Sequence, residues 1–539
     1  MQEFTSSNIA ERLDLLTEVS VALGDAQAIG GFLDRILKVA KSMTHADGGT
    51  LYRPSSDGRS LCFHISLNDT LEIYQGGASG NAIDLPPVPL YDGYGNKNLS
   101  SVAAYAANFH QSVNIADVYK ADVFNFSGMR SFDATFGYRS KSFLTVPMTD
   151  HDGELVGVLQ LINAIDPDTG EVRSFSDTDQ RFIEALASQA AVAITNQQLL
   201  EQLEKLLESL VNLINIGIDE KSPYTGRHCQ FVPELTMMLA EAVHDTSIGP
   251  MAGFRMNDAD RKELWLAGLL HDCGKITTPV HVVDKATKLE TIFDRIHMVD
   301  TRFEVLLRDA EIRALRAQCR PGADLDAIEA GLQEEQAQLR ADRDFLRHAN
   351  VGSEGMTPAD QERVQRIAAY RWVGPDGLAR DFLEADEVRN LTVRFGTLTE
   401  EERKIINNHI VVTIRMLESL PWPRHLKNVP EYAGGHHERV DGKGYPRGLT
   451  REQMSVQARV MAIADIFEAL TARDRPYKKG KTLSESLHIL GKFALNGHID
   501  PDLFDIFVRQ KVYVKFARKN LDPSQIDAVD EAAIPGYQP

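Results

Sequence analysis

The chain has 539 residues, 43% of them hydrophobic, and a formal net charge of −19 at pH 7. This length suffices for about two or three domains, and the hydrophobic fraction is ordinary for a globular protein. Nucleic-acid surfaces are normally basic, so the acidic balance argues against a nucleic acid polymer as a partner.

The first two hundred residues combine helical and β-rich patterns. Amphipathic helices are predicted over residues 9–22 and 32–43, and a longer helical stretch over 177–210 closes the region. The dipeptide Asp152-Gly153 is a hairpin signal. The predicted strands are residues 49–53, 61–65, 142–148 and 155–163.

This order of elements resembles a GAF domain, a sensory α/β (α+β) fold with a central antiparallel sheet and a pocket for a small ligand. Residues 101–107, 113–119 and 137–142 are similar to GAF domains of cyclic-nucleotide phosphodiesterases and their bacterial relatives. The resemblance implies a GAF sensory domain over 1–195, with an unknown small-molecule ligand. The alternative is an empty GAF domain that serves only in dimerisation.

Such GAF domains often carry an Asn-Lys…Phe-x-x-x-Asp-Glu motif. The chain keeps Asn163, Phe175 and Asp179, while Ala164 and Gln180 replace the Lys and the Glu. We therefore expect the Lys–Asp ion pair of the motif to be lost.

A helix is predicted to join this region to the rest of the chain. Apolar residues recur at spacings near three and four from Phe182 to Leu213, with Gln and Glu between them. This pattern is typical of a continuous signalling helix, with residues 196–216 as the linker. Such a helix buries its apolar stripe best against a copy of itself, which predicts a parallel homodimer. A core helix packed within one subunit is the alternative.

Two strings further along the chain carry metal-binding residue types. The apolar stretch 264–270 predicts a buried helix and leads into HDCGK at 271–275; the second string is HHERVDGKGYP at 436–446. Alone, the first could be a helix-end His with a capping Asp. Imidazole and carboxylate pairs together suit Fe, Mn, Zn or Ni, and a carboxylate can bridge two ions that activate water and clamp a phosphoryl group. The pair of strings predicts a metal-dependent phosphohydrolase.

The second string matches every fixed position of HHExxDGxGYP, the signature of the HD-GYP family, a branch of the HD phosphohydrolases that hydrolyses cyclic di-GMP. Residues 222–228, 400–409 and 458–477 resemble further segments of that family. The resemblance implies an all-α HD-GYP domain over 217–525, followed by a tail at 526–539. It implies these metal ligands: His228, His271, Asp272, His409, His436, His437 and Asp465.

The same resemblance assigns roles within the site. Asp272 would bridge the metals, and Lys275, about one helical turn beyond, would meet a phosphate oxygen as a point charge. The apolar sequence around Asp465 by itself favours a ligand role for this residue. A carboxylate inside an apolar run is rarely buried unless it is paired or binds a metal. The implied catalytic residues are Asp272 and Lys275, and the implied substrate-binding residues are Lys275, Asp441, Gly444, Tyr445, Pro446 and Arg475.

At two positions the chain departs from the family's pattern, which limits the family properties that can be expected of it. Tyr224 stands where some members have a Glu that helps hold a third metal, so we expect two divalent ions, Fe or Mn. Phe231 replaces a common Arg, which puts one phosphate contact in doubt.

A third departure is an insertion at about 291–396. It separates Lys288-Leu289-Glu290 from residues 397–401, which together resemble one short family loop. Its content of Arg, Glu, Ala, Leu and Gln predicts a long antiparallel helical pair that covers the site or contacts a partner subunit. His297, at its start, rivals His409 as the middle ligand; the similarity of residues 400–409 to the family helix favours His409.

The expected function is that of a sensor-regulated cyclic di-GMP phosphodiesterase that forms pGpG and, in a further cut, GMP. The alternatives are an HD phosphohydrolase acting on another cyclic nucleotide, and a non-catalytic cyclic di-GMP receptor or interaction module. The resemblance also implies diguanylate cyclase (GGDEF) proteins as partners. The four scattered cysteines lack CxxC spacing, and no apolar run reaches transmembrane length, so we expect a cytoplasmic location without membrane insertion.

Overall fold

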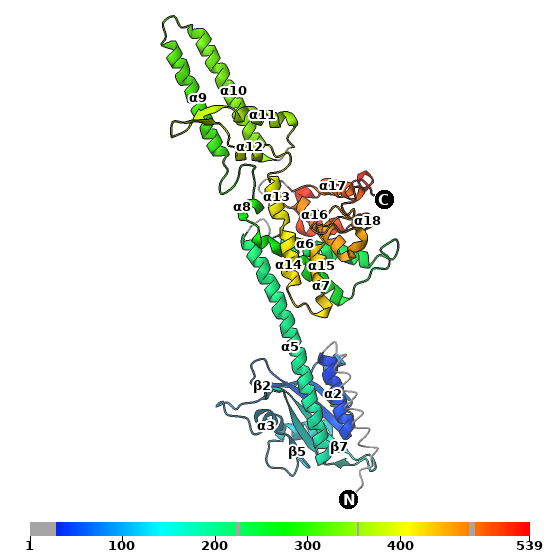
Figure 1. Ribbon diagram of the computed structural model, residues 1–539. Coiled ribbons are helices and arrows are strands. Elements are labelled where there is room, and N and C mark those ends of the chain that lie inside the picture. Colours follow the sequence, from blue (N-terminus) through cyan, green and yellow to red (C-terminus); the bar gives the residue numbers. More distant parts are fainter. Residues whose placement is uncertain (1–28, 222–226, 353–354, 474–479) are drawn as a thin grey trace. The chain divides into compact units, whose positions relative to one another are not determined.

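The computed structural model describes residues 29–221, 227–352, 355–473 and 480–539. The chain divides into two compact units, Met1–Leu207 and Glu208–Pro539, and each is described by itself (Figure 1). The helix expected over 9–22 lies outside the described residues. No described helix is both long and apolar enough to cross a membrane.

The first unit is built on an antiparallel sheet in the order β3-β2-β1-β7-β6-β5, with β4 paired to β2 and β8 to β7. The predicted hairpin joins β6 to β7, and Gly153 in its turn has a φ of 82°, which glycine adopts without strain. The strands are β1 (Ala46–Pro54), β2 (Ser60–Asn68), β3 (Ile73–Gly76), β4 (Val88–Pro89), β5 (Val113–Ile115), β6 (Phe143–Thr149), β7 (Leu155–Ile165) and β8 (Val172–Arg173).

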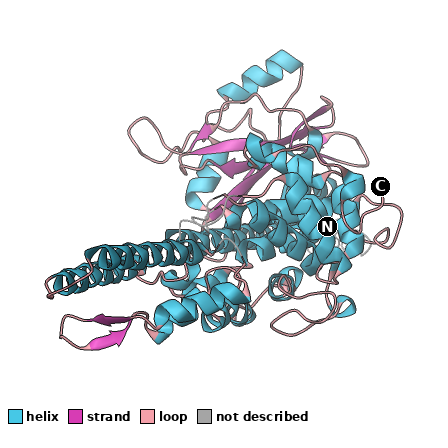
Figure 2. Cartoon of the chain, turned by 90° about the horizontal axis from the view of Figure 1, so that it is seen from above, coloured by secondary structure: helices cyan, strands magenta, loops and turns pink. Residues whose placement is uncertain are grey.

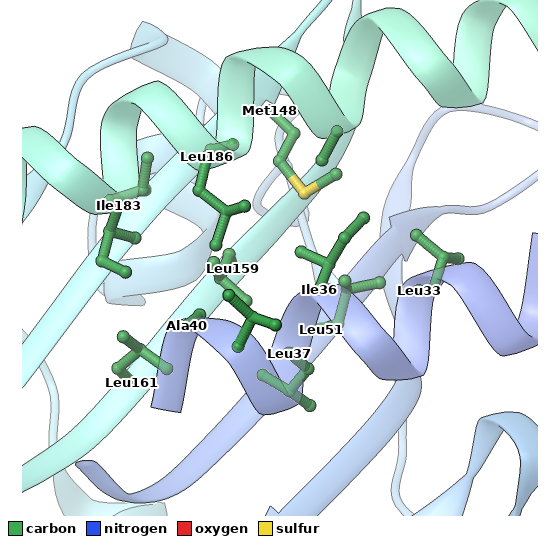
Figure 3. Packing of buried hydrophobic residues seen from close by; sticks show 14 of the residues in the cluster. Leu33, Ile36, Leu37, Ala40, Leu51, Met148, Leu159, Leu161, Ile183 and Leu186 are labelled. Atoms are coloured by element: carbon green, nitrogen blue, oxygen red, sulfur yellow. The ribbon is translucent and has the colours of Figure 1, made fainter. Parts of the chain in front are cut away.

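Helices cover this sheet. The apolar sides of α2 (Ile29–Thr44) and of the start of α5 (Asp177–Lys221) meet the central strands in one hydrophobic core (Figure 3). Two further helices, α3 (Val102–Phe109) and α4 (Ser127–Phe136), complete the unit. The antiparallel sheet with helices confirms the fold expected for the N-terminal part of the chain.

The Lys–Asp ion pair of the motif is absent, as Ala164 leads one to expect, but Asp179 is paired with another cation. Arg173 Nη1 lies 2.7 Å from the Asp179 carboxylate, whose side chain is 1% exposed. Burial by itself would raise the pKa of Asp179, but the hydrogen bond from Arg173 lowers it below its ordinary value. The cation is supplied from β8 instead of the position of Ala164. Asn163 is also held, because its side-chain oxygen accepts from the backbone N–H of Lys141 at 2.7 Å.

The predicted continuous helix is present as α5, which runs without a break for 45 residues. Its first turns are buried in the core of the first unit, as at Ile183 and Leu186. Its later leucines are 45% to 65% exposed: Leu199, Leu200, Leu203, Leu206, Leu210 and Leu213.

The described residues of the second unit are helical apart from loops and one short hairpin (Figure 2). The elements flanking the insertion are α6 (His228–His244), α7 (Asp258–Leu270), the 3₁₀ helix η2 (Cys273–Thr277), α8 (Val280–Val283), α13 (Glu400–Asn407), α14 (His409–Glu418), α15 (Val429–Gly434), α16 (Val456–Thr471), α17 (Leu483–Leu495), α18 (Pro501–Arg509) and α19 (Val512–Asn520). Helix α6 packs against both α7 and α16, so residues from both sides of the insertion share one core.

The insertion contains the predicted antiparallel pair, α9 (Ile296–Gln318) and α10 (Leu325–Val351), which lie side by side in Figure 1. Ion pairs join the two helices in antiparallel order, from Asp300–Arg347 at one end to Arg313–Glu335 at the other. The expectation of a purely helical insertion was incomplete. Besides α11 (Pro358–Ala368) and α12 (Ala385–Leu391), it holds a hairpin of β9 (Arg371–Val373) and β10 (Ala379–Asp381).

Candidate metal centre

Most of the predicted ligands lie at helix ends. His271 follows directly on α7, Asp272 precedes η2, and His409 begins α14. The helix expected to carry His409 is thus two helices, since α13 ends at Asn407. Asp465 alone projects from the middle of a helix, the otherwise apolar α16.

A first group of possible metal ligands consists of His228, His271 and Asp272. The Nε2 atoms of the two histidines are 3.2 Å apart. Asp272 Oδ2 lies 3.0 Å from His228 Nε2 and 3.3 Å from His271 Nε2. Asp465 Oδ1 joins this group, 3.3 Å from His228 Nε2.

A second group consists of His409, His436 and His437. The Nε2 atoms of His409 and His437 are 3.3 Å apart. Asp272 connects this group to the first, because its other oxygen, Oδ1, lies 3.1 Å from His409 Nε2. One carboxylate therefore presents an oxygen to each group, as a bridging ligand must.

Backbone carbonyls fix the histidine tautomers. The Nδ1 atoms of His271, His409 and His436 each lie 2.5–2.7 Å from the carbonyl oxygen three residues earlier. Each Nδ1 must carry the proton in such a contact, so each Nε2 keeps a lone pair directed into the cluster. This is the arrangement by which neutral imidazoles ligate metals.

These residues fit metal ions. Asp272 Oδ1 and His436 Nε2 are buried without a hydrogen-bond partner among the described residues, although both can accept one. Unpartnered buried acceptors are costly, and a bound cation removes that cost. Imidazole nitrogens and carboxylate oxygens together are a donor set for first-row transition metals. The two groups can therefore hold metal ions.

The charges of the cluster suit the same role. Burial alone would raise the pKa of Asp272, but the adjacent Lys275 ammonium holds that pKa well below its ordinary value, so the carboxylate is ionised at neutral pH. Burial lowers the pKa of His437 to about 4, so that imidazole is neutral. Metal ligands need these protonation states.

Glu468 is a supporting residue that the sequence reasoning missed. Its carboxylate lies 2.5 Å from His228 Nδ1, and it is 3% exposed. A carboxylate on the far nitrogen orients a ligating histidine and raises its basicity. The sequence feature that could have identified Glu468 is its spacing from Asp465. It follows Asp465 by three residues on α16, so both lie on one helix face.

The loop after His437 is shaped by Glu438 and Gly444. The Glu438 carboxylate accepts hydrogen bonds from the backbone N–H groups of Arg447 and Leu449, at 2.7 and 2.9 Å. A Cβ on Gly444 would lie 2.3 Å from the backbone nitrogen of Arg439, so only glycine fits there. The loop thereby folds back on the histidine pair.

Tyr445 and Asp441 occupy different parts of this loop. The Tyr445 ring stacks on His437, with centroids 4.8 Å apart and planes 21° from parallel, and a cis peptide bond joins it to Pro446. Asp441 instead pairs with Arg439 at 2.8 Å and accepts from the Lys443 N–H at 3.0 Å, contacts that shape the loop itself.

Lys275 lies at the cluster, with Nζ 2.5 Å from Asp272 Oδ2. Phe231 packs edge-to-face on Phe516, with centroids 5.9 Å apart, and belongs to the packing between α6 and α19. Tyr224 and Arg475 lie outside the described residues. The rival ligand His297 is exposed on α9 and belongs to neither group of donors, whereas His409 is 4% exposed.

Comparison with known proteins finds a GAF domain at residues 29–194 and HD domain sequence at 225–339 and 385–503. The chain therefore combines a GAF domain with HD-family sequence. The first donor group lies in one HD stretch and the second in the other, so the candidate metal centre draws on both.

Curated relatives include a cyclic di-GMP phosphodiesterase of Pseudomonas aeruginosa, 40% identical over 21% of this chain and 26% of the relative. A 3′3′-cGAMP-specific phosphodiesterase of Vibrio cholerae is 36% identical over 25% of this chain and 30% of the relative. A cyclic di-GMP phosphodiesterase of Thermotoga maritima is 36% identical over 29% of this chain and 39% of the relative. The chain thus spans well under half the length of each.

Proposed function

We propose that the protein is a sensor-regulated phosphodiesterase that hydrolyses cyclic di-GMP to pGpG, with a further cut to GMP. The observation that carries this proposal is the Asp272 carboxylate, which faces two groups of donors beside the loop formed by HHERVDGKGYP. The names of the Pseudomonas and Thermotoga relatives support cyclic di-GMP as the substrate.

The chemistry follows from the donor set. We assign His228, His271, Asp272, His409, His436, His437 and Asp465 to two divalent metal ions, Fe or Mn. When bound, such ions provide a hydroxide at neutral pH and stabilise charge on a phosphoryl group. Lys275 is close enough to Asp272 to exchange that contact for a phosphate oxygen. Tyr445, stacked on His437, would form a wall of the substrate site.

Turnover of a nucleotide panel tests the proposal. The full chain, purified anaerobically and analysed for metals, should hydrolyse cyclic di-GMP in preference to 3′,5′-cyclic AMP and cyclic GMP. The Vibrio relative supports 3′3′-cGAMP as a second candidate substrate. Turnover of that nucleotide with none of cyclic di-GMP would favour the second candidate. Tight binding of cyclic di-GMP without any turnover would instead identify a receptor.

The choice between His409 and His297 gives a sharp metal-content prediction. We expect His409→Ala to lower bound metal by about one ion per chain, because His409 faces both Asp272 and His437 inside the cluster. His297→Ala is the matched control and should leave metal content unchanged, since that side chain is exposed on α9. Elemental analysis of both variants measures this, and the reverse pattern would transfer the ligand role to His297.

We also propose a parallel homodimer through the exposed leucines of α5. Leu199, Leu203, Leu206, Leu210 and Leu213 recur at alternating spacings of four and three, the pattern by which two helices bury a common seam. The GAF domain would act on the HD region through this helix, and GGDEF proteins are the cyclic di-GMP sources that the proposal implies.

Placing a charge in this seam should separate the dimer. We expect Leu206→Glu to shift the full chain from dimer to monomer in sedimentation experiments, because like charges would face each other in the seam. Gln198→Glu adds the same charge beside the stripe and should leave the dimer intact. A monomeric unaltered protein would refute the proposed interface.

A further inference from the structure

A cavity lies in the second unit, where the insertion meets α13. Its volume is about 730 Å³, within the range of small-molecule sites. One wall comes from the insertion, with Gln361, Arg389 and residues 392–395, and the other from residues 398–401, Arg403, Lys404 and Asn407. None of the seven proposed metal ligands lines it.

The cavity concentrates positive charge in a chain whose net charge is −19. Four cations line it, Arg389, Arg394, Arg403 and Lys404, against two carboxylates, Glu400 and Glu401. Clustered Arg and Lys side chains of this kind attract anions, and an Arg guanidinium matches the geometry of a phosphate.

Two of these four cations have a polar partner within the described part of the chain. Arg389 pairs with Asp386, and Arg403 donates to the Phe395 carbonyl at 3.3 Å. Among the described residues, neither Arg394 nor Lys404 makes a side-chain ion pair or hydrogen bond. Their charges are therefore available to a ligand.

The cavity also offers an aromatic surface. Phe395 is 64% exposed, and the Arg394 guanidinium lies 5.7 Å from its ring centroid. Exposed aromatic rings beside cations are the surfaces on which nucleobases stack while their phosphates are neutralised. Cations, an open ring and this volume together fit a nucleoside phosphate better than a purely inorganic anion.

A short path connects this cavity to the metal centre. Helix α13 forms one wall, and the carbonyl of Ile406 at its end accepts from His409 Nδ1. The same helix is held to the insertion by buried Lys285, which contacts Glu402 and Asn390 at 2.8 Å. A ligand that joins Arg394 to Lys404 would therefore fix α13 and, through it, the orientation of His409.

We propose that this cavity binds a nucleoside phosphate as an effector, separate from the substrate at the metal centre. That the cavity binds this effector follows from the cavity alone. That the bound effector changes turnover rests on the proposed phosphodiesterase function. The insertion then serves to build a regulatory nucleotide site next to a helix that positions a metal ligand.

Calorimetric titration of the full chain with GTP, inorganic pyrophosphate and guanosine tests the site. We expect GTP to bind, pyrophosphate to bind more weakly because it has no base to stack on Phe395, and guanosine to bind much more weakly because it has no phosphate. The double variant Arg394→Ala/Lys404→Ala should weaken GTP binding about tenfold or more, with metal content unchanged. Arg308→Ala/Arg313→Ala removes two charges from the exposed face of α9 and should change binding by less than about twofold.

The Asp272→Ala variant separates the two sites. GTP binding that persists in this variant and is lost in the Arg394/Lys404 variant supports the cavity. Binding lost in Asp272→Ala but retained in the double variant would place the nucleotide at the metal centre and overturn the proposal, as would no binding at about millimolar GTP. If the protein binds GTP at the cavity but hydrolyses no cyclic di-GMP, the proposed function fails while the effector site stands.

Discussion

The Asp272→Ala variant is expected to lose measurable hydrolysis of cyclic di-GMP and to release metal from every chain. Asp272 is the one described side chain whose two oxygens face both donor groups, at 3.0 Å from His228 Nε2 and 3.1 Å from His409 Nε2. Without it, each group loses a ligand and five imidazoles face one another without the bridging charge. We expect metal affinity to fall at least about a hundredfold.

Elemental analysis and turnover assays on the same preparation measure this effect. Asp326→Ala, an exposed aspartate on α10, is the matched control and should behave like the unaltered protein. Circular dichroism should show that both variants retain their helices. Near-normal metal content and activity in Asp272→Ala would refute the bridging assignment.

Gly274→Ala is expected to disrupt the same centre without removing any ligand. A Cβ at this position would lie 2.0 Å from the His409 carbonyl oxygen and 2.6 Å from the Thr413 nitrogen, both backbone atoms. The backbone of η2 therefore contacts α14 directly, and the Gly274 N–H donates to Thr413 Oγ1 at 2.9 Å. The added methyl must push His409 away from Asp272.

We expect this substitution to lower the free energy of unfolding by about 1–3 kcal/mol, as overpacking does, and to reduce metal content. Denaturant unfolding and elemental analysis measure the two effects. Gly331→Ala is the control: Gly331 lies on α10, an added Cβ would have no neighbouring atom within 4 Å, and the substitution should stabilise the protein by about 0.5–1 kcal/mol. A stable, fully metal-loaded Gly274→Ala variant would contradict the close approach that we describe.

Local patterns predicted the elements well. The strands at 155–163 and 142–148 appear as β7 and β6, because short apolar runs on either side of an Asp-Gly turn are a local signal for a hairpin. The helical pair of the insertion was predictable for the same reason, since its Arg, Glu, Ala, Leu and Gln content favours helix at most positions. The β9–β10 hairpin was missed; its three-residue strands are too short to show a period.

Pairings between distant residues could not be predicted in this way. The loss of a lysine at Ala164 suggested a missing ion pair, yet Arg173 replaces it from another strand. An ion pair needs only a cation within reach of Asp179, and the sheet decides which residues are within reach. Sequence position alone does not identify such a substitute.

For the metal centre, the sequence by itself determined the residue types: adjacent His-Asp and His-His pairs, a carboxylate inside an apolar helix, and a match to a known signature. Only the tertiary structure decided which of these donors face each other, that His409 and not His297 lies among them, and that Glu468 supports His228. The physical reason is that ligand geometry depends on packing between helices far apart in the chain. The contact of Gly274 with α14 brings residues on either side of a hundred-residue insertion within 3.1 Å of each other, and no local pattern encodes that distance.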